Sequence, residues 1–513
     1  MSVEDENPPN PIDLDRLLIW LESIADQPER MNDLDAEIHR RLLVATGRIA
    51  LPNRLERRRF AQNRRRTEAN RTRQRDDAAL EGTSNRARKR ALAFPVAPAE
   101  IEISDEHRRL LELQARRRET GTSAESLLES RTCYVCKAEF RELHHHYDSM
   151  CSPCATLNWT KRTQSADLSG RVALVTGARV KIGYEIVLLL LRAGARVIAT
   201  TRFVVDAAER FRREADFDEW ADRLELHALD LRNTPSVERF CAERLERESG
   251  LDFLVHNACQ TVRRPPAYYE EMVAGEDPAR LPQETRGLIG SLASEGLKAS
   301  DEAGADRAVA VADAPDDVAA LSTLDLLGEA ALKPLFPQGM RDGDGQPLDL
   351  RATNSWRMNL HEVSTLELIE VQLVNAIAPF VLNARLKSLM LAVPTQDKHI
   401  VHVSAMEGQF YRTFKTTRHP HTNMAKAALN MMTRTSAADF ARDGIHMNSV
   451  DTGWVTDEDP FEKAVDKQET QRFTPPLDAL DGAARVLDPI FSGLNSGQHA
   501  WGQFLKDYAP TRW

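Results

Sequence analysis

Four cysteines in two pairs form the clearest chemical pattern in this sequence of 513 residues. Cys133 and Cys136 make one C-x2-C pair, and Cys151 and Cys154 make a second pair fourteen residues further on. Two such pairs can supply four thiolates to a tetrahedral Zn²⁺ ion. Four protein ligands leave no position for a reactive water, so we predict a structural zinc site. The run His144–His146 lies between the pairs and offers an alternative ligand or an outer hydrogen-bond partner.

A second pattern suits a phosphate group. The stretch VALVTGARVKIGYEIVLLLLRAGARVIATTR, residues 172–202, reads as a strand, a glycine turn, a helix and another strand. Gly177 permits a sharp turn, and Gly183 lets the helix begin close to the first strand. The helix N-terminus then presents free N–H groups and a positive dipole end to a pyrophosphate. Placement in a βαβ unit makes this pattern more specific than a glycine pair alone.

Short β-branched strands and helices alternate from about Leu168 onward. The segments LELHALDL, LDFLVHNA, KHIVHVSA and IHMNSVDTG continue the series. This alternation predicts an α/β fold with a Rossmann-type, doubly wound parallel sheet over residues 166–513. Residues 265–355 interrupt it, and their Ala- and Asp-rich middle part is interpreted as an inserted loop or lid.

The residues before the sheet have a different composition. Residues 13–50 show helical periodicity, and a further helix is predicted near SDEHRRLLELQARRR, with Ser104 as its N-cap. We therefore divide this part into a helical, Arg-rich region, residues 1–128, and a zinc-binding unit, residues 129–165.

Charge is distributed unevenly along the chain. The net charge is −10, yet residues 54–90 hold 14 basic and 5 acidic residues, a local charge of +9. We favour a solvated helix or a disordered arm here. Contact with nucleic-acid phosphates is the weaker interpretation, because Phe60 is the one aromatic residue in the segment.

The sequence shows no secretory or membrane pattern. The N-terminus, MSVEDENPPNP, is acidic and Pro-rich, and the apolar run Ile186–Leu191 is too short to cross a bilayer. Clustered thiols favour a metal in a reducing compartment over disulfides. We expect a cytoplasmic protein.

From about Leu168 the chain resembles the short-chain dehydrogenase/reductase family. Thr176–Gly183, TGARVKIG, resembles the family's TGxxxGxG turn, with Lys181 in place of the middle glycine. Asp230 matches the adenine-contacting aspartate, and HNAC, His256–Cys259, resembles NNAG. DTGWVTDE resembles the nicotinamide-side loop, with Thr452 in place of the usual proline. Together with the charges considered below, the resemblance implies these cofactor-binding residues: Thr176, Gly177, Arg179, Lys181, Ile182, Gly183, Thr201, Arg202, Asp230, Leu231, Asn257, Ala258, Lys426, Gly453, Val455 and Thr456.

The resemblance also implies a catalytic set. Asn375 matches the asparagine that supports a proton-relay water, Ser404 the serine that binds the substrate carbonyl, and Lys426 the lysine that binds the nicotinamide ribose. Thr422 stands where the family has its tyrosine, four residues before Lys426. A threonine hydroxyl is too weak an acid to replace a tyrosine whose pKa a nearby ammonium lowers.

Other groups near this position are candidates for the missing proton donor. Tyr411 lies seven residues after Ser404, in a segment longer than the family's usual spacing, and it is the candidate we include in the catalytic set. His419 and His421 are alternatives, because a histidine titrates near neutral pH. A third interpretation is that no group replaces the tyrosine.

The choice of cofactor follows from charge. An acidic residue at the end of the second strand would bind the ribose hydroxyls of NAD. The sequence has Thr201 and Arg202 there instead, and Arg202 with Arg179 can bind a 2′-phosphate. We therefore favour NADP over NAD.

These patterns favour an NADP(H)-dependent oxidoreductase acting on a carbonyl or alcohol, with an altered proton donor. The alternative is a catalytically inactive dinucleotide-binding sensor or scaffold, with protein or nucleic-acid contacts through the basic arm. The resemblance further implies a homodimer or homotetramer that pairs through two long helices, one of them containing Lys426.

Overall fold

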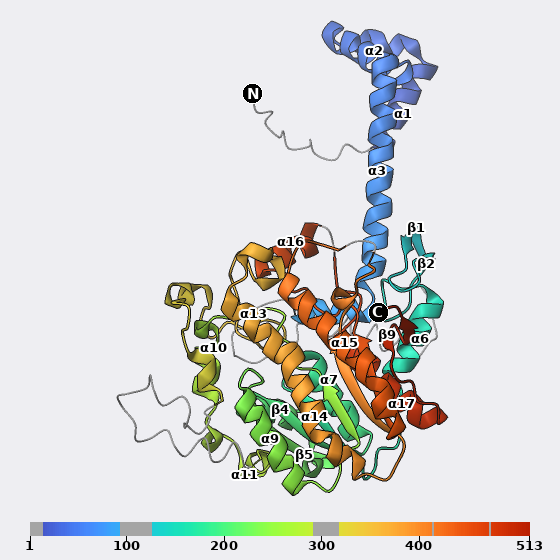
Figure 1. The fold of residues 1–513 in the computed structure, drawn as a ribbon. Coiled ribbons are helices and arrows are strands. Elements are labelled where there is room, and N and C mark those ends of the chain that lie inside the picture. The colour runs from blue at the N-terminus through green and yellow to red at the C-terminus, as the bar shows by residue number, and fades with distance from the viewer. Residues whose placement is uncertain (1–13, 93–125, 291–317, 413–414, 471–472) are drawn as a thin grey trace. The chain divides into compact units, whose positions relative to one another are not determined.

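The structure is a computed structural model, and it forms two compact units, Met1–Asp77 and Ala78–Trp513 (Figure 1). The helix predicted near Ser104 and most of the Ala- and Asp-rich part of the insertion lie outside the residues that the structure describes. The described residues are 14–92, 126–290, 318–412, 415–470 and 473–513.

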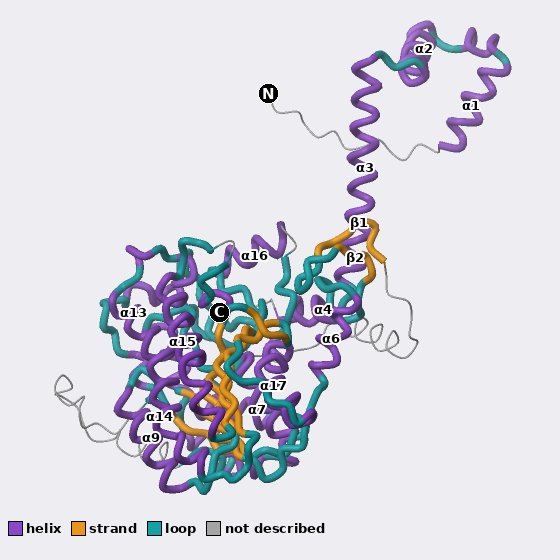
Figure 2. The backbone as a smooth tube through the Cα atoms, turned by 45° about the vertical axis from the view of Figure 1, so that its right-hand side comes forward, coloured by secondary structure: helices purple, strands orange, loops and turns teal. Residues whose placement is uncertain are grey.

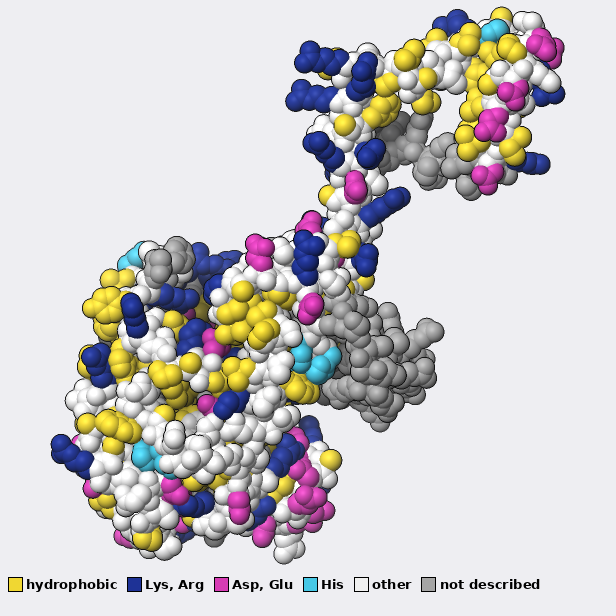
Figure 3. All heavy atoms as spheres, turned by 90° about the vertical axis from the view of Figure 1, so that its right-hand side faces the viewer, with side chains coloured by type: hydrophobic (Ala, Val, Ile, Leu, Met, Phe, Trp, Pro, Cys, Tyr) yellow, Lys and Arg dark blue, Asp and Glu magenta, His cyan; other side chains and the backbone are white. Residues whose placement is uncertain are grey.

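The first unit is helical, which confirms the periodicity found before residue 50. Helices α1 (Leu14–Asp26) and α2 (Ala36–Ala50) are joined by a 3₁₀ turn, Pro28–Asp33, and helix α3 (Arg54–Glu81) follows. Asp35 caps α2, because its carboxylate accepts hydrogen bonds from the Glu37 and Ile38 N–H groups. The arginine-rich segment is thus a helix, and Figure 3 shows exposed Lys and Arg side chains along it.

An eight-stranded sheet organises the second unit. Seven strands are parallel, and the last one pairs antiparallel with its neighbour at one edge. This arrangement confirms the predicted Rossmann-type fold. Across the sheet the strands are β10 (Ala509–Thr511), β9 (Phe504–Lys506), β8 (Ile445–Asp451), β7 (Lys398–Ser404), β6 (Phe253–His256), β3 (Val172–Thr176), β4 (Arg196–Thr201) and β5 (Leu224–Ala228).

Both faces of the sheet are covered by helices. Successive side chains of a strand point to opposite faces, and here both sets are apolar and need to be buried. Val175 and Val255 pack toward helices α7 (Lys181–Arg192), α8 (Val204–Arg212) and α17 (Ala479–Ser496). Leu174 and Leu254 pack toward the other face. Figure 2 shows the strands between the two helical layers. The second layer contains α9 (Thr234–Arg247), α13 (Thr365–Gln372), α14 (Ala378–Leu391) and α15 (Pro420–Arg442).

One helical segment, Thr365–Ala392, is long and apolar enough to cross a membrane by length and composition. It comprises α13, a π-helical turn at Leu373–Ile377, and α14. Leu382 and Leu386 of this segment are buried against the sheet. One face of the segment therefore packs in the core of the α/β domain, while 39% of its most apolar window is buried in all.

The remaining elements of the second unit lie outside the two helical layers. Helix α4 (Ser84–Leu92), the hairpin of β1 (Ser126–Thr132) and β2 (Glu139–Glu142), and helix α6 (Ser152–Arg162) precede the first central strand. Our sequence-based boundaries separated residues 129–165 from the sheet, whereas the compact unit includes both. The insertion contributes α10 (Pro266–Gly275) and α11 (Gln283–Arg286), and α16 (Phe461–Thr470) lies near the C-terminus.

Candidate functional site

A cavity of about 1010 Å³ lies where the parallel strands end. This edge of a doubly wound sheet is where ligands bind in such folds. Most of the predicted site residues line it, but Thr176, Asn375 and Tyr411 do not. The predicted residues in the lining are Gly177, Arg179, Lys181, Ile182, Gly183, Thr201, Arg202, Asp230, Leu231, Asn257, Ala258, Ser404, Lys426, Gly453, Val455 and Thr456.

The glycine turn at the base of the cavity depends on two close approaches. A Cβ on Gly183 would lie 2.0 Å from the Gly177 carbonyl oxygen, and one on Gly177 would lie 2.7 Å from the Ala258 Cα. The Asn257 side chain donates a hydrogen bond to the Gly177 carbonyl at 2.9 Å. The N-terminus of α7 therefore opens directly into the cavity, as a pyrophosphate site requires.

Lys181 replaces a glycine at a position that demands an unusual backbone. Its φ is +54°, a region in which a side chain other than glycine costs about 1 kcal/mol. Its ammonium lies 3.5 Å from Asp344 of the insertion and 3.7 Å from Glu458 after β8. These carboxylates, Glu458 foremost, raise the pKa of Lys181. A bound phosphate would have to share this ammonium with both.

The two arginines near the end of β4, Arg179 and Arg202, differ in their surroundings. Arg179 is paired with Asp206 at 2.6 Å and also donates to Gln346. Arg202 donates to Ser322 and to the Tyr269 hydroxyl, both at 3.1 Å, and forms no salt bridge with any residue that the structure describes. Its guanidinium therefore lines the cavity without a carboxylate in direct contact, although its charge still lowers the pKa of nearby Asp230.

Asp230 is placed as predicted, but its carboxylate is already engaged. Arg232 contacts both oxygens, with the shortest contact at 2.6 Å. Asp230 is buried, which raises its pKa, yet the Arg232 guanidinium outweighs burial and lowers that pKa overall. This end of the cavity therefore contains a fixed ion pair.

Two of the four predicted catalytic residues, Ser404 and Lys426, line the cavity, whereas Asn375 and Tyr411 do not. The Lys426 ammonium donates to the Val403 carbonyl at 2.7 Å, and the Ser404 hydroxyl donates to the Asn430 side chain at 2.6 Å. Thr422 is buried, and its hydroxyl has no hydrogen-bond partner within the described part of the chain. Asn375 sits in the π-helical turn, a feature frequent at functional sites.

Asn375 itself is tied to the backbone beside the cavity. Its carbonyl oxygen accepts from the Gln260 N–H at 2.7 Å, and its amide donates to the Gln260 carbonyl at 3.2 Å. These two bonds join α13 and α14 to the segment after β6. Asn375 therefore lies behind the cavity wall rather than in it.

The candidate proton donors occupy three different environments. Tyr411 is 84% exposed and lies outside the cavity lining, so the structure does not fold it over the site. His421 is buried 3.4 Å from Glu367, also outside the lining. His419 lines the cavity, where its ring stacks on Trp356 with centroids 3.9 Å apart and planes within 2°. Its Nδ1 lies 3.1 Å from the Asn423 side-chain oxygen.

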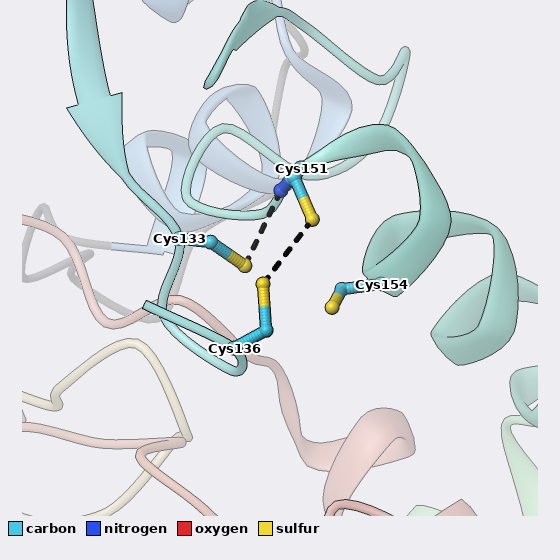
Figure 4. Close-up of side chains that lie close together, drawn as sticks. All are labelled: Cys133, Cys136, Cys151 and Cys154. Atoms are coloured by element: carbon cyan, nitrogen blue, oxygen red, sulfur yellow. Dashed lines mark hydrogen bonds between the residues drawn. The ribbon is translucent and has the colours of Figure 1, made fainter. Parts of the chain in front are cut away.

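The four predicted metal ligands also converge (Figure 4). Their sulfur atoms all lie within 4.8 Å of one another. Cys133 follows β1, Cys136 lies in the next turn, and Cys151 and Cys154 open helix α6. Burial raises the pKa of the Cys133 thiol, but backbone N–H groups, Cys151 first, outweigh it and lower that pKa to about 7. Such a thiol is ready to bind a metal as thiolate.

The histidines between the cysteine pairs do not complete this set. His146 accepts or donates a hydrogen bond at 2.7 Å with Ser84 and lies near Asp478 and Asp481 instead. Arg162 already bridges those two carboxylates at 2.6 and 2.8 Å. The group formed by His146, Asp478 and Asp481 therefore already has a cation, the Arg162 guanidinium, beside its carboxylates.

Several lining residues were not predicted. Tyr134 and Lys137 come from the cysteine-containing unit, Tyr269 from the insertion, and Trp356 from the segment after it. The cysteine spacing predicts only a metal-binding turn for the segment that contains Tyr134 and Lys137. No local pattern marked the other two, because only the tertiary fold brings them to the cavity.

A doubly wound sheet with a glycine turn, a serine at the end of β7 and a lysine on the neighbouring helix α15 are features of the dinucleotide-binding enzymes of Rossmann type. The chain belongs to the short-chain dehydrogenase family. A family model described as short chain dehydrogenase matches residues 171–273, and one described as enoyl-(acyl carrier protein) reductase matches residues 350–474.

The relatives of the chain match it over very different lengths. Uncharacterized protein R665 of Acanthamoeba polyphaga mimivirus is 32% identical over 393 residues, 73% of this chain and 74% of the relative. Retinol dehydrogenase 11 of Mus musculus is 36% identical over 96 residues, 19% of this chain. The chain spans 30% of the length of that mouse enzyme.

Solved structures were also compared. A dehydrogenase/reductase from Sinorhizobium meliloti 1021 is 18% identical, with a TM-score of 0.41 over 68% of this chain and 97% of that one. A short chain dehydrogenase from Burkholderia cenocepacia J2315 in complex with NADP is 18% identical, with a TM-score of 0.41 over 66% of this chain and 97% of that one.

Proposed function

We propose that this short-chain dehydrogenase family member is an NADP(H)-dependent oxidoreductase acting on a carbonyl or alcohol. The observation that carries the proposal is Arg202, a cation without a carboxylate partner at the end of the second strand. Among the described residues that line the cavity, 12 are Lys or Arg and 6 are Asp or Glu. This excess of positive charge suits a ligand with several phosphates.

The residues present fit such a cofactor. The close approach at Gly183 leaves room for a pyrophosphate at the N-terminus of α7, Arg202 would bind the 2′-phosphate, and Lys426 would bind the nicotinamide ribose. When bound, the cofactor supplies or accepts a hydride. The protein's own residues then have to orient the substrate oxygen and move one proton.

We propose His419 as the group that moves this proton. Of the three candidates it alone lines the cavity, and its neighbour Asn423 fixes the ring orientation. Burial lowers the pKa of His419 below the ordinary histidine value. A neutral imidazole accepts a proton from an alcohol at pH 7, so the arrangement favours the oxidation direction. Ser404 would orient the oxygen once its hydroxyl leaves Asn430.

The second candidate function is a non-catalytic dinucleotide sensor or scaffold. Thr422 favours it, because a threonine hydroxyl at the position of the family's tyrosine is too weak an acid to donate a proton to a substrate. The two functions share the same cofactor site and differ only in turnover.

We further propose that the four cysteines hold one structural Zn²⁺. Convergence of four sulfurs within 4.8 Å supports this, because two C-x2-C pairs brought together in this way match the ligand set of a tetrahedral Zn²⁺ site. A metal-thiolate site also suits a reducing compartment, so we propose a cytoplasmic location.

We propose a second copy of the chain as partner, giving a homodimer or homotetramer. Helices α13, α14 and α15 leave large apolar side chains exposed, more than single scattered residues would explain. The exposed side chains are Ile369, Ile377, Phe380, Leu391, Met424 and Met431. An isologous contact would bury the same patch on both copies.

Replacing Arg202 tests the choice of cofactor. We expect Arg202→Gln to raise the Kd for NADPH by about 10- to 100-fold and to change the Kd for NADH less than about 2-fold, because one charge-assisted contact is lost. Arg213→Gln, at an exposed arginine of the same region, is the matched control. Equal affinity of the wild type for NADPH and NADH would contradict the proposal.

Replacing His419 tests the proton path. We expect His419→Gln to lower the NADP⁺-dependent oxidation of a panel of alcohols by roughly 10²- to 10⁴-fold, because the base that accepts the alcohol proton is removed. Tyr411→Phe should leave turnover unchanged. In the wild type, alcohol oxidation should rise with pH through a pKa below that of ordinary histidine, and the variant should lack this limb.

The opposite pattern, with activity lost in Tyr411→Phe alone, would refute the His419 assignment. NADPH binding without turnover on any substrate of the panel would favour the sensor function.

Metal analysis tests the cysteine site. Protein purified without chelator should contain about one zinc ion per chain, and Cys154→Ser should lose it with a clear drop in Tm, since metal binding contributes folding free energy. Cys259→Ser, at an exposed cysteine outside the cluster, should keep the zinc. Absence of zinc from the wild type would rule the site out.

Sedimentation tests the helical interface. Phe380 is 61% exposed, and Phe380→Glu should convert the wild-type oligomer to monomer by placing a charge in the buried patch. Leu245→Glu on α9 is the control and should leave the mass unchanged. A monomeric wild type at micromolar concentration would contradict the proposal.

A further inference from the structure

One hydrophobic core joins the cysteine-containing unit to both sides of the cofactor cleft. Leu127, Tyr147 and Met150 of that unit pack with Val455 and Leu477. Ile182 and Ala479 are partly buried against the same core. Ile182 belongs to the glycine turn and Val455 to the nicotinamide-side loop. The cysteine-containing unit therefore packs against two segments that line the cleft.

Tyr134 makes the most direct contact between the two. It lies between two metal ligands, Cys133 and Cys136, and its hydroxyl accepts a hydrogen bond from the Trp454 N–H at 2.9 Å. A Cβ added to Gly453 would lie 3.1 Å from that hydroxyl. The tyrosine therefore packs against the loop backbone immediately before Val455, and it also lines the cavity.

Lys89 of α4 links the nicotinamide-side loop at Val455 to residues 475–477, which precede α17. Its ammonium donates to the Val455 carbonyl at 3.2 Å, to the Pro475 carbonyl at 2.7 Å, and to the Leu477 carbonyl. Asn85 of the same helix donates to the Pro476 carbonyl at 3.0 Å. Burial lowers the pKa of Lys89 to about 8, which leaves the ammonium largely protonated at neutral pH.

The start of helix α17 completes the attachment. Arg162 of α6 bridges Asp478 and Asp481, and the Tyr147 hydroxyl donates to Asp481 at 2.6 Å. Residues 454–455 at the start of this segment and residues 475–481 at its end are thus both held by residues that precede strand β3. Arg202 and Asp230, which serve the adenine half, take no part in these contacts.

We propose that the cysteine-containing unit and α4 position the nicotinamide half of the cofactor cleft, with Tyr134 and Lys89 as the positioning residues. This inference rests on the proposed cofactor site. Loss of the metal would free the turn that carries Tyr134, and the loop at Gly453–Val455 would lose its support. The adenine half would keep its own contacts, so the effect is confined to ligands that contain nicotinamide.

The test compares two ligands on the full-length protein. NADPH occupies both halves of the cleft, whereas adenosine 2′,5′-bisphosphate occupies only the adenine half. We expect Tyr134→Phe to raise the Kd for NADPH by about 3- to 10-fold, and Lys89→Met by at least about 10-fold, with the bisphosphate Kd unchanged. Zinc-stripped wild type should lose NADPH affinity in the same way and regain it when zinc is restored.

The matched control is Lys161→Met, which removes a lysine of the same unit that contacts Asp488 and Ser492 of α17 rather than the loop. It should leave the Kd of both ligands unchanged. Equal losses for NADPH and the bisphosphate in Tyr134→Phe would overturn the inference, because they would indicate general disruption of the cleft. Unchanged NADPH affinity in both positioning variants would also overturn it.

A second measurement does not depend on the cofactor. Hydrogen exchange of the peptide containing Trp454 should be faster in Tyr134→Phe and in zinc-stripped protein than in the wild type. If the wild type binds neither ligand, the proposed function fails, but slower exchange in the zinc-bound wild type would still support positioning of the loop. Unchanged exchange in both would overturn it.

Discussion

The approach of helix α7 to the end of strand β3 is the constraint on which the rest of the site depends. A single methyl group on Gly183 would lie 2.0 Å from the Gly177 carbonyl oxygen, far inside contact distance. This closeness brings the first turn of the helix to the cavity floor, and Asn257 secures it from the neighbouring strand. The same turn carries Ile182 into the core shared with the cysteine-containing unit, so the position of the helix start affects both parts.

The charged residues around this turn are organised in two ways. Several are neutralised within the protein, as Arg179 is by Asp206 and Arg232 is by Asp230. Others, Arg202 above all, face the cavity without a carboxylate partner among the described residues. The first kind fixes the walls, because a paired buried charge resists displacement. The second kind is available for a ligand, and its location at the end of β4 determines which part of a dinucleotide it would meet.

Much of the fold could be predicted from the sequence, because hydrophobic periodicity and the glycine turn are local signals. The parallel sheet, the N-terminal helices and the convergence of the four cysteines all follow from such signals. Local signals named three candidates for the proton-transferring group, Tyr411, His419 and His421, but could not show which of them reaches the cavity. Tyr411 was attractive by its distance in sequence from Ser404, yet it is solvent-exposed. His419 reaches the cavity because its backbone turns at φ +42° and its ring stacks on Trp356, a residue more than sixty positions earlier.

The shared core has a consequence for how the chain folds. The four clustered cysteines are close in sequence, so the turns that contain them can form early in synthesis. Tyr134 meets Trp454 across 320 positions and Tyr147 meets Asp481 across 334. Contacts of such long range form late. The apolar side chains around the cysteines therefore stay partly uncovered until almost the whole chain has been synthesised.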